Sequence, residues 1–331
     1  MRKSLFAEDI KLGRVGLGCM TMSGGYSPAN RDAAESVRVI HRAVELGITL
    51  FDTADVYGPF ENEMLLGRAL RGHRDAVVIA TKCGLVAGPD GRFSRDGRPD
   101  HIHAACENSL RRLGTDVIDL YQLHRVDPAV PLDETWGAMA ALVTEGKVRT
   151  LGISHATVPE LTWVHSIFPV AAVQYELSIW NTGNRNDVLP WCHDNDVAFV
   201  AFSPLGRGYL SGNVAGDIGP DDSRSRDPRF TANAMAANEI IVKGVRTVAD
   251  RIDATPAQVA IAWTLAQADR VVALPGTRTR RWLEEDYAAL QIRLSAADLD
   301  ELDALPASTG RMDWDRRRST GATSVHPTRE A

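Results

Sequence analysis

The sequence predicts an α/β protein built as a single (β/α)8 barrel. Short apolar runs alternate along the chain with longer amphipathic segments of helical periodicity. The apolar runs do not alternate polar with apolar residues, which is typical of parallel strands buried on both faces. Eight runs are expected to be strands: residues 15–17, 49–51, 77–80, 118–123, 148–153, 171–175, 197–202 and 271–274. No polar or Pro/Gly-rich linker interrupts the middle of the chain, so one domain is expected over residues 1–331.

Helix boundaries support this order. Capping residues open the expected helices and glycines end several of them. The clearest examples are Asp32-x-x-Glu35, residues 99–113 followed by Gly114, Thr157-x-x-Glu160 and Thr255-Pro256-x-Gln258. A doubly wound open sheet is the rival fold. It requires a G-x-G-x-x-G sequence after the first strand, and the segment at Gly16-Leu17-Gly18 lacks the third glycine.

Several additions to a bare barrel are expected. They are an N-terminal strand or hairpin, long loops at residues 83–99 after strand three and 205–229 after strand seven, and an extra C-terminal helix capped by Ser295. The polar, Arg-rich tail over residues 306–331 is expected to be partly mobile.

Composition restricts the class of protein. The chain has 44% apolar and 24% charged residues, and no run approaches the roughly 18 apolar residues of a membrane span. No export signal is recognised, and four scattered cysteines indicate neither a zinc site nor disulfides, so a cytoplasmic location is expected. A net charge of −6 argues against nucleic acid as the main partner. The oligomeric state is left open.

The stretch TLFDTADVYG, residues 49–58, carries the chemistry around which the chain is organised. An apolar strand is followed at once by Asp52, Asp55 and Tyr57, and the next two strands end at Lys82 and His124. Neighbouring barrel strands lie about 5 Å apart, and barrel active sites form at the carboxyl ends of the strands. Asp52, Tyr57, Lys82 and His124 are therefore expected to share one site.

These four residue types suit proton donation to a substrate oxygen. A phenol has a pKa near 10, and a nearby ammonium is expected to favour the phenolate and ease proton release from Tyr57. Asp52 would hold Lys82 charged, and His124 would orient a carbonyl or join the proton relay.

Taken singly, each of these residues has a simpler explanation. An Asp or Lys is usually a solvated loop group, a Tyr a rim aromatic and a His a satisfied core residue. Their joint occurrence at three successive strand ends favours catalysis. By default Trp136, Trp163, Trp191 and Trp263 belong to the core, as do Cys19 and Cys83. Trp180 is left open between a substrate contact and a packing residue.

The segments FDTADVYG, TKCG and LYQLHRVD occur in this order, and over nearly its whole length the chain resembles the aldo-keto reductase superfamily. The resemblance implies that Tyr57 is the general acid, that Lys82 and Asp52 tune it, and that His124 orients the carbonyl. It also implies that NADP(H) lies across the carboxyl face of the barrel without a Rossmann motif.

The resemblance assigns the cofactor contacts residue by residue. Ser154 and Gln174 correspond to the side chains that hold the nicotinamide carboxamide, with His155 where asparagine is frequent, and Phe202 stacks on the ring. The FSPLGRG segment resembles the pyrophosphate loop, with contacts expected from Ser203, Leu205, Gly206 and Arg207. Thr277 and Arg278 would grip the 2′-phosphate, while Glu285 and Asp286 would face the adenine, Asp286 replacing the usual asparagine.

The sequence therefore predicts NADPH-dependent reduction of a small-molecule aldehyde or ketone. One alternative stays open: an NADP(H)-binding regulatory or partner subunit with little turnover, as in the channel-associated β subunits similar to this family. A hydrolase on the same barrel is less favoured, since no metal cluster or base-activated nucleophile is recognised. The YELSIW and FSPLGRGYLSG segments look like the branch with pyridoxal, sugar-related and general aldehyde reductases.

Overall fold

A computed structural model describes residues 12–28, 31–88, 92–214 and 218–310. Eight parallel strands form one sheet in the order β1-β2-β3-β6-β7-β8-β9-β10. Bridges from Val15 to Ala273 and from Gly18 to Gly276 join the first strand to the last and close the sheet into a barrel. The predicted (β/α)8 architecture is confirmed. The open-sheet alternative is excluded because such a sheet keeps two free edges.

The strand positions agree with the apolar runs of the sequence to within a few residues. The barrel strands are β1 (Leu17–Gly18), β2 (Leu50–Asp52), β3 (Val78–Cys83), β6 (Ile118–Leu123), β7 (Val148–Ser154), β8 (Val170–Glu176), β9 (Ala198–Phe202) and β10 (Val271–Leu274).

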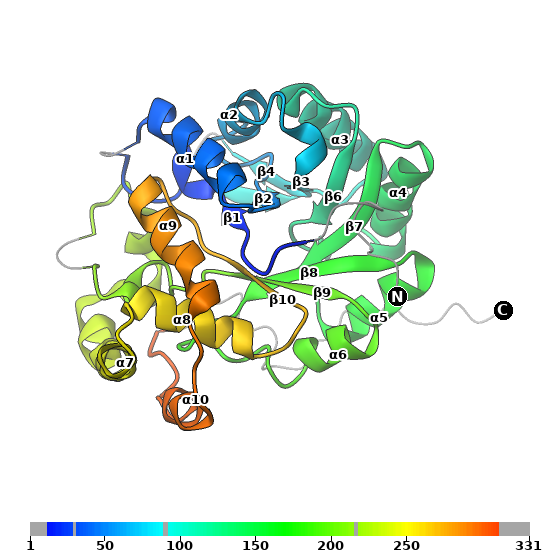
Figure 1. The fold of residues 1–331 in the computed structure, drawn as a ribbon. Coiled ribbons are helices and arrows are strands. Elements are labelled where there is room, and N and C mark those ends of the chain that lie inside the picture. Colours follow the sequence, from blue (N-terminus) through cyan, green and yellow to red (C-terminus); the bar gives the residue numbers. More distant parts are fainter. Residues whose placement is uncertain (1–11, 29–30, 89–91, 215–217, 311–331) are drawn as a thin grey trace.

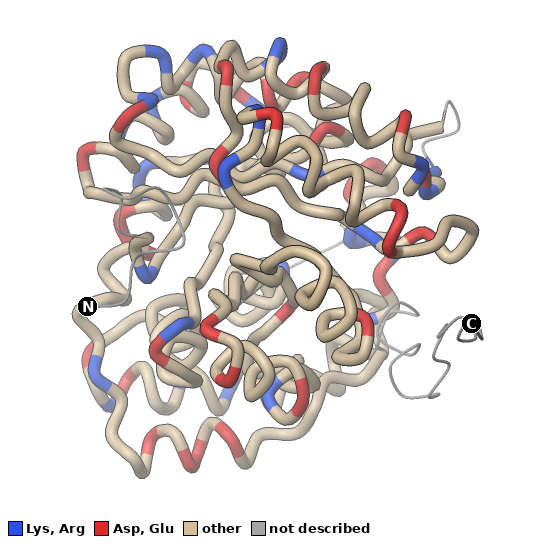
Figure 2. The backbone as a smooth tube through the Cα atoms, turned by 90° about the vertical axis from the view of Figure 1, so that its right-hand side faces the viewer, with Lys and Arg blue, Asp and Glu red and all other residues tan. Residues whose placement is uncertain are grey.

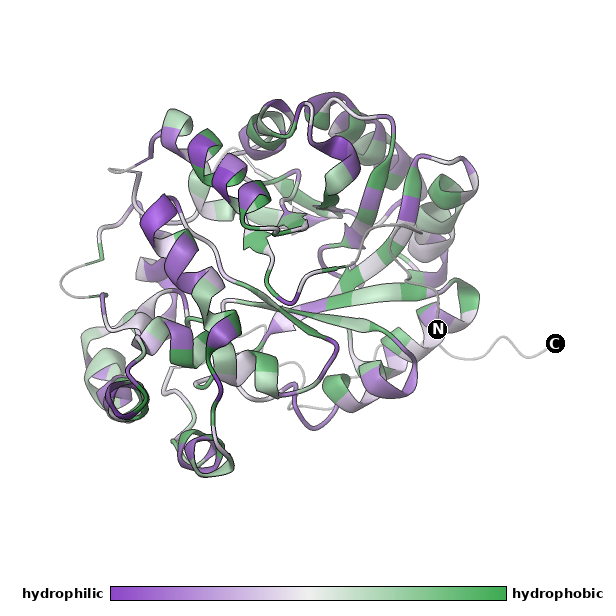
Figure 3. Ribbon diagram, in the orientation of Figure 1, coloured by the Kyte–Doolittle hydropathy of each residue, from purple (hydrophilic) through white to green (hydrophobic). Residues whose placement is uncertain are grey.

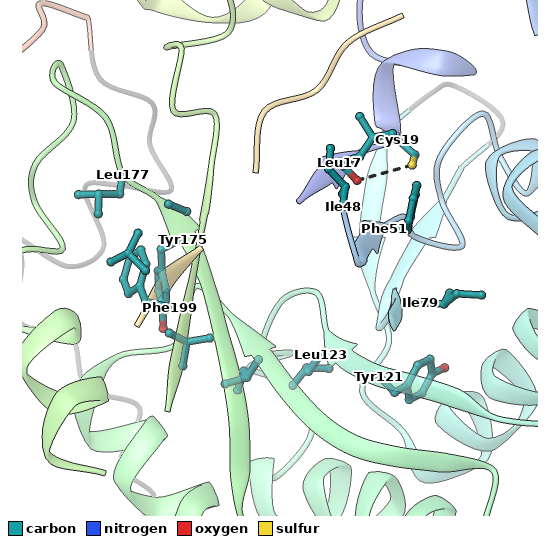
Figure 4. Packing of buried hydrophobic residues seen from close by; sticks show 14 of the residues in the cluster. Leu17, Cys19, Ile48, Phe51, Ile79, Tyr121, Leu123, Tyr175, Leu177 and Phe199 are labelled. Carbon is teal, nitrogen blue, oxygen red and sulfur yellow. Dashed lines mark hydrogen bonds between the residues drawn. The ribbon is translucent and has the colours of Figure 1, made fainter. Parts of the chain in front are cut away.

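The two faces of each strand have different surroundings. Side chains such as Leu50, Ala80, Leu120 and Val200 form an apolar cluster inside the barrel. Their neighbours along the strands belong to the larger core between strands and helices, where Figure 4 shows Phe51, Ile79, Tyr121 and Phe199 among others. Because successive side chains of a strand point to opposite faces, the barrel has two concentric apolar layers.

Helices surround the strands on the outside (Figure 1). They are α1 (Ala33–Glu45), α2 (Glu61–Ala69), α3 (Pro99–Leu113), α4 (Leu132–Thr144), α5 (Val158–Ile167), α6 (Val188–Asp194), α7 (Ala232–Arg251), α8 (Pro256–Ala266), α9 (Arg280–Ala288) and α10 (Ala296–Asp303). The capping boxes predicted at Thr157 and Thr255 are present, and Gly114 ends α3 in a left-handed conformation.

Three parts of the fold differ from the sequence expectation or add to it. The loop after β3 contains an antiparallel hairpin, β4 (Leu85–Ala87) with β5 (Phe93–Arg95). The long segment after β9 contains three 3-10 helices and is followed by α7, a helix that the sequence analysis did not anticipate. Hairpin and helix both lie outside the βα repeat, so the alternation of strands and helices gave no cue to them.

The C-terminal additions are partly described. The predicted extra helix is α10, capped by Ser295 in a capping box with Asp298. Residues 306–310 are tied down, because the Ser308 N–H donates to the Trp180 carbonyl at 3.2 Å and Thr309 pairs with Asn238. The rest of the expected mobile tail, residues 311–331, lies outside the described residues. So does any part of the expected N-terminal strand or hairpin within residues 1–11.

One expected core tryptophan lies at the surface. Trp136, Trp191 and Trp263 are buried as predicted, whereas the Trp163 side chain is 55% exposed. On α5 the buried residues are Leu161 and Val164, and Trp163 lies about 100° around the helix from Val164. The helix therefore turns Trp163 toward solvent.

Hydropathy and charge follow the layered arrangement. Hydrophilic residues lie on the helices that surround the strands (Figure 3), and lysines and arginines are interspersed with acidic residues along the chain (Figure 2). Over the described ranges, no helix is both long and apolar enough to cross a membrane.

A glycine pair tests the packing of the outer layer. At Gly67 in α2, a Cβ would overlap the Leu113 carbonyl oxygen at the end of α3, whereas a Cβ at Gly137 in α4 would meet no atom within 4 Å. We expect Gly67→Ala to lower the free energy of unfolding by roughly 1–3 kcal/mol. The matched Gly137→Ala change should be neutral or stabilising by up to about 1 kcal/mol. Urea denaturation measures both, and equal effects would contradict this account of the α2–α3 contact.

Candidate active site

The site occupies the carboxyl end of the barrel, where the inward-facing positions of the strands become polar. On β2, β3 and β6 an apolar side chain faces the barrel interior, and the side chain two residues later is polar. These polar residues are Asp52, Lys82 and Gln122. The strand register places Lys82 opposite Gln122 and Ser154 opposite Gln174. The period of two along each strand therefore collects these side chains in one layer above the apolar interior.

Lys82 is the centre of this layer. Its side chain is fully buried, and its ammonium contacts Asp52 Oδ1 at 2.5 Å, the Thr53 carbonyl oxygen at 2.7 Å and the Tyr57 hydroxyl at 3.4 Å. The same ammonium lies 5.0 Å from the centroid of the Tyr57 ring. Burial opposes the charge on Lys82, but Asp52 and Tyr57 outweigh it and raise the pKa of the lysine. Lys82 is therefore charged at neutral pH.

Asp52 accepts hydrogen bonds from more residues than the sequence suggested. Besides Lys82, the amide groups of Gln174 and Gln122 donate to Asp52 Oδ2 at 2.7 and 3.2 Å. The sequence analysis missed Gln122. Its position two residues before His124 on the same strand face was the available signal, since both must then point into the barrel. These donors satisfy a carboxylate that is only 3% exposed.

His124 lies edge-on to the phenol. The two rings are 5.9 Å apart between centroids and nearly perpendicular at 85°. The pKa of His124 lies well below its usual value because burial disfavours the cation, and Arg125, Lys82 and His155 add positive charge nearby. His124 is therefore a neutral imidazole, and its buried Nδ1 has no hydrogen-bond partner among the described residues.

Lys82 favours the Tyr57 phenolate as expected, but burial decides the net shift of the phenol pKa. Lys82 and Arg125 do lower the pKa of the phenol, but burial and Asp52 raise it, and the net direction is upward. Desolvation is the largest of these effects, and no sequence pattern reports it. Tyr57 is thus a protonated phenol at neutral pH, held beside a cation that would stabilise its conjugate base. This arrangement can donate a proton.

The residues expected around a nicotinamide adjoin the catalytic group. Ser154 donates to the Gln174 carbonyl oxygen at 2.8 Å, and Gln174 uses its amide nitrogen on Asp52. The side-chain oxygen of Gln174 is the end left to accept from a carboxamide. His155 has φ 57°, a left-handed conformation in which asparagine and histidine are enriched. Its ring lies 5.5 Å from that of Phe202.

The expected pyrophosphate loop is a tight turn with an unusual backbone. Ser203, Gly206 and Arg207 have positive φ angles, and the Gly206 N–H donates to the Ser203 carbonyl within the turn. The loop, with Leu205 between these residues, packs against Trp180, because a Cβ at Gly206 would come within 2.6 Å of that indole. Trp180 is fully buried, which excludes the substrate-contact alternative and makes it a packing residue.

Positive charge gathers where the 2′-phosphate is expected. Arg278 is half-buried and donates to the Ser27 carbonyl at 2.8 Å, beside the buried Thr277. Its pKa is lowered by burial and then by the neighbouring cations Arg31 and Arg224. Asp222, which pairs with Arg224 at 2.8 Å, offsets part of this repulsion, and an anion would relieve the rest.

The predicted adenine side has a different character. Asp286 is 4% exposed on α9, next to the half-buried Glu285. Burial and the Glu285 charge raise the pKa of Asp286 well above its usual value. The shift favours the neutral carboxyl, which can donate a hydrogen bond as the amide of an asparagine does. The guanidinium of Arg207, a residue expected at the pyrophosphate, lies 3.5 Å from the Asp227 carboxylate.

Within the described ranges, no group of three or more His, Cys, Asp or Glu side chains is arranged to hold a metal ion.

Comparison with known proteins gives the family. The model of the aldo/keto reductase family matches residues 14–307. The chain belongs to the aldo/keto reductase family. It is 38% identical over 305 residues to the soybean (Glycine max) protein named probable aldo-keto reductase 1, covering 91% of this chain and 88% of that protein.

Solved aldo/keto reductase structures share the fold. The glycerol dehydrogenase of Gluconobacter oxydans superposes with a TM-score of 0.81 at 29% identity, covering 98% of this chain and 97% of the other. An aldo/keto reductase of Klebsiella pneumoniae in complex with NADP and acetate gives a TM-score of 0.70 at 29% identity, with 94% and 98% covered.

Asp55, two residues before Tyr57, allows a test of how burial of a carboxyl group affects the stability of the fold. The Asp55 side chain is 5% exposed, and burial together with the Glu63 charge raises its pKa from 3.8 to about 7. A carboxyl whose folded-state pKa is raised destabilises the fold progressively as pH rises from about 4 to 7. We expect Asp55→Asn to be more stable than the wild type by up to about 4 kcal/mol at pH 8, with the gap closing near pH 4.

Chemical denaturation between pH 4 and pH 8 measures this difference. The matched change Asp269→Asn, at an exposed aspartate, should leave the free energy of unfolding close to that of the wild type over the whole pH range. A stability difference for Asp55→Asn that does not depend on pH would show that Asp55 is ionised in the folded protein.

Proposed function

We propose that this aldo/keto reductase transfers a hydride from NADPH to the carbonyl carbon of an aldehyde or ketone, with Tyr57 donating the proton to the carbonyl oxygen. The observation that carries the proposal is the contact of the Lys82 ammonium with the Tyr57 hydroxyl at 3.4 Å, beside the Asp52 carboxylate and the neutral His124. A buried cation next to a phenol lowers the cost of the phenolate that remains after proton donation.

The described residues fit a phosphorylated dinucleotide. Arg31 and Arg278 bring positive charge to the place expected for the 2′-phosphate, whereas Arg224 pairs with Asp222 at 2.8 Å. The side-chain oxygen of Gln174 can accept from a carboxamide, because its amide nitrogen donates to Asp52. The complex of the Klebsiella pneumoniae relative with NADP supports the same cofactor for this chain. Ser203, Leu205, Gly206 and Arg207 are proposed to meet the pyrophosphate, and Phe202 to lie beside the nicotinamide.

The chain's own groups then divide the work. NADPH supplies the hydride when it is bound. Tyr57 moves its hydroxyl proton to the oxygen as negative charge develops there, and Lys82 stabilises the resulting phenolate. Asp52 keeps Lys82 charged and directed at the phenol, and His124, being neutral, adds no competing positive proton donor beside Tyr57. The buried layer below Asp52 keeps water out of the ion pair.

Turnover distinguishes this proposal from an NADP(H)-binding partner subunit. A panel of aliphatic, aromatic and sugar-derived aldehydes, including glyceraldehyde, is followed by loss of NADPH absorbance. Multiple turnovers support the enzyme. Tight cofactor retention with no turnover on any member of the panel would favour the partner subunit.

Replacing the proposed acid tests its role. We expect Tyr57→Phe to lower kcat by at least about 100-fold, because general acid catalysis contributes roughly 10²–10⁴-fold. NADPH binding, measured by protein fluorescence, should change little. Tyr175→Phe, which removes a buried hydroxyl from the outward face of β8, serves as a control and should retain kcat. Retained turnover in Tyr57→Phe would remove this residue as the proton donor.

The phosphate contact is tested by comparing two cofactors. We expect Arg278→Ala to raise the Kd for NADPH by about 10-fold or more, because a charge-assisted contact to phosphate is worth roughly 1.5–3 kcal/mol. The Kd for NADH, which lacks the 2′-phosphate, should rise less than threefold. Arg293→Ala, at an exposed arginine in the segment after α9, is the matched control. Equal losses for both nucleotides would contradict the assignment.

A further inference from the structure

Arg125 follows His124 at the end of β6. Its guanidinium is half-buried, and one terminal nitrogen, Nη1, donates to two acceptors. These are the His124 carbonyl oxygen at 2.6 Å and the Ser154 hydroxyl oxygen at 3.3 Å. The arginine therefore joins the end of β6 to the end of β7 at the level of the reacting groups.

The contact with Ser154 continues as a chain of hydrogen bonds around the barrel mouth. Ser154 donates to the Gln174 carbonyl at 2.8 Å, and the Gln174 amide donates to Asp52 at 2.7 Å. Asp52 pairs with Lys82, which reaches the Tyr57 hydroxyl. Because the Tyr57 ring lies against His124, the chain of contacts returns to β6 and closes. Arg125 is the member that links the expected cofactor side to the histidine.

Arg125 follows His124 in the chain, and its charge acts on the pKa of both proton-handling residues. Around Tyr57, Lys82 and Arg125 favour the phenolate, Asp52 opposes it, and His124 lies edge-on. Around His124, burial disfavours the imidazolium most, and the charges of Arg125, Lys82 and His155 act in the same direction. Arg125 is thus a second cation acting on the same two rings.

We propose that Arg125 is a positioning residue of the reaction: it ties Ser154 to the main chain of His124 and places a positive charge next to the proton-handling residues. This inference rests on the proposed function. It assigns two separable roles to one side chain, a geometric one that depends on where Nη1 lies and an electrostatic one that needs only positive charge.

Two substitutions separate these roles. Arg125→Gln removes the charge, and Arg125→Lys keeps the charge on a shorter side chain. Arg293→Gln is the matched control, because this exposed arginine also donates to two main-chain carbonyls, those of Leu290 and Ile292. Three measurements are made on the full-length protein: the pH profile of kcat/KM for alcohol oxidation, the Kd for NADPH, and the NMR titration of His124. A His124→Asn spectrum assigns the resonance.

The electrostatic role predicts shifts along the pH axis. In Arg125→Gln, the rise of kcat/KM for alcohol oxidation with pH, which requires the Tyr57 phenolate, should shift to higher pH by roughly 0.5–1 unit, the effect expected from removing one nearby charge. The His124 resonance should titrate at higher pH by a similar amount. Arg125→Lys should restore both, which a merely structural residue would not do. The geometric role predicts a Kd for NADPH raised several-fold in both variants and unchanged in Arg293→Gln.

Two outcomes would overturn the proposal. One is a pH limb and a His124 titration that are the same in Arg125→Gln as in the wild type. The other is a loss in Arg125→Gln that is uniform over pH and is not rescued by lysine. Failure of the proposed function is distinguishable, because the wild type would then lack NADPH turnover. The NMR titration needs no turnover and would still decide whether Arg125 acts on His124.

Discussion

The structure at the barrel mouth depends on one buried ion pair, between Lys82 and Asp52. Neither side chain is more than 5% exposed, so each charge would be costly without the other. Side-chain amides on two further strands donate hydrogen bonds to the Asp52 carboxylate, and Lys82 donates another hydrogen bond to the Thr53 carbonyl oxygen. Removing one partner would leave an uncompensated charge in the barrel. The same constraint places a fixed cation beside the Tyr57 hydroxyl.

Strand geometry makes this pair possible. Parallel strands alternate their side chains between the barrel interior and the helical layer, and closure through Val15 and Ala273 leaves no free edge. The apolar interior at Leu50 and Ala80 lies directly below the polar layer and excludes water from it. Where Asp52 and Lys82 meet, the strands therefore supply both the alignment and the low dielectric that strengthen the pair.

A second buried ion cluster supports the side of the barrel mouth that is expected to bind the cofactor. Arg229 is 1% exposed and contacts Glu176 at 2.7 Å and Asp227 at 2.8 Å. Its guanidinium also lies 4.9 Å from the centroid of Trp180, the indole on which Gly206 packs. The long segment after β9 is thus anchored to β8 through charge and aromatic contacts. This explains how a glycine-rich loop keeps a defined turn at the mouth of the barrel.

The sequence by itself determined the repeat of strands and helices, several helix caps and the meeting of Asp52, Tyr57, Lys82 and His124 at one site. These follow from periodicity and from the fixed polarity of parallel strands, which are local properties. Tertiary structure decided the rest. Gln122 and Arg125 entered the site through contacts across neighbouring strands, Trp163 turned outward, and the pKa of Tyr57 moved upward. Burial and neighbouring charge set these outcomes, and both depend on segments far apart in the chain.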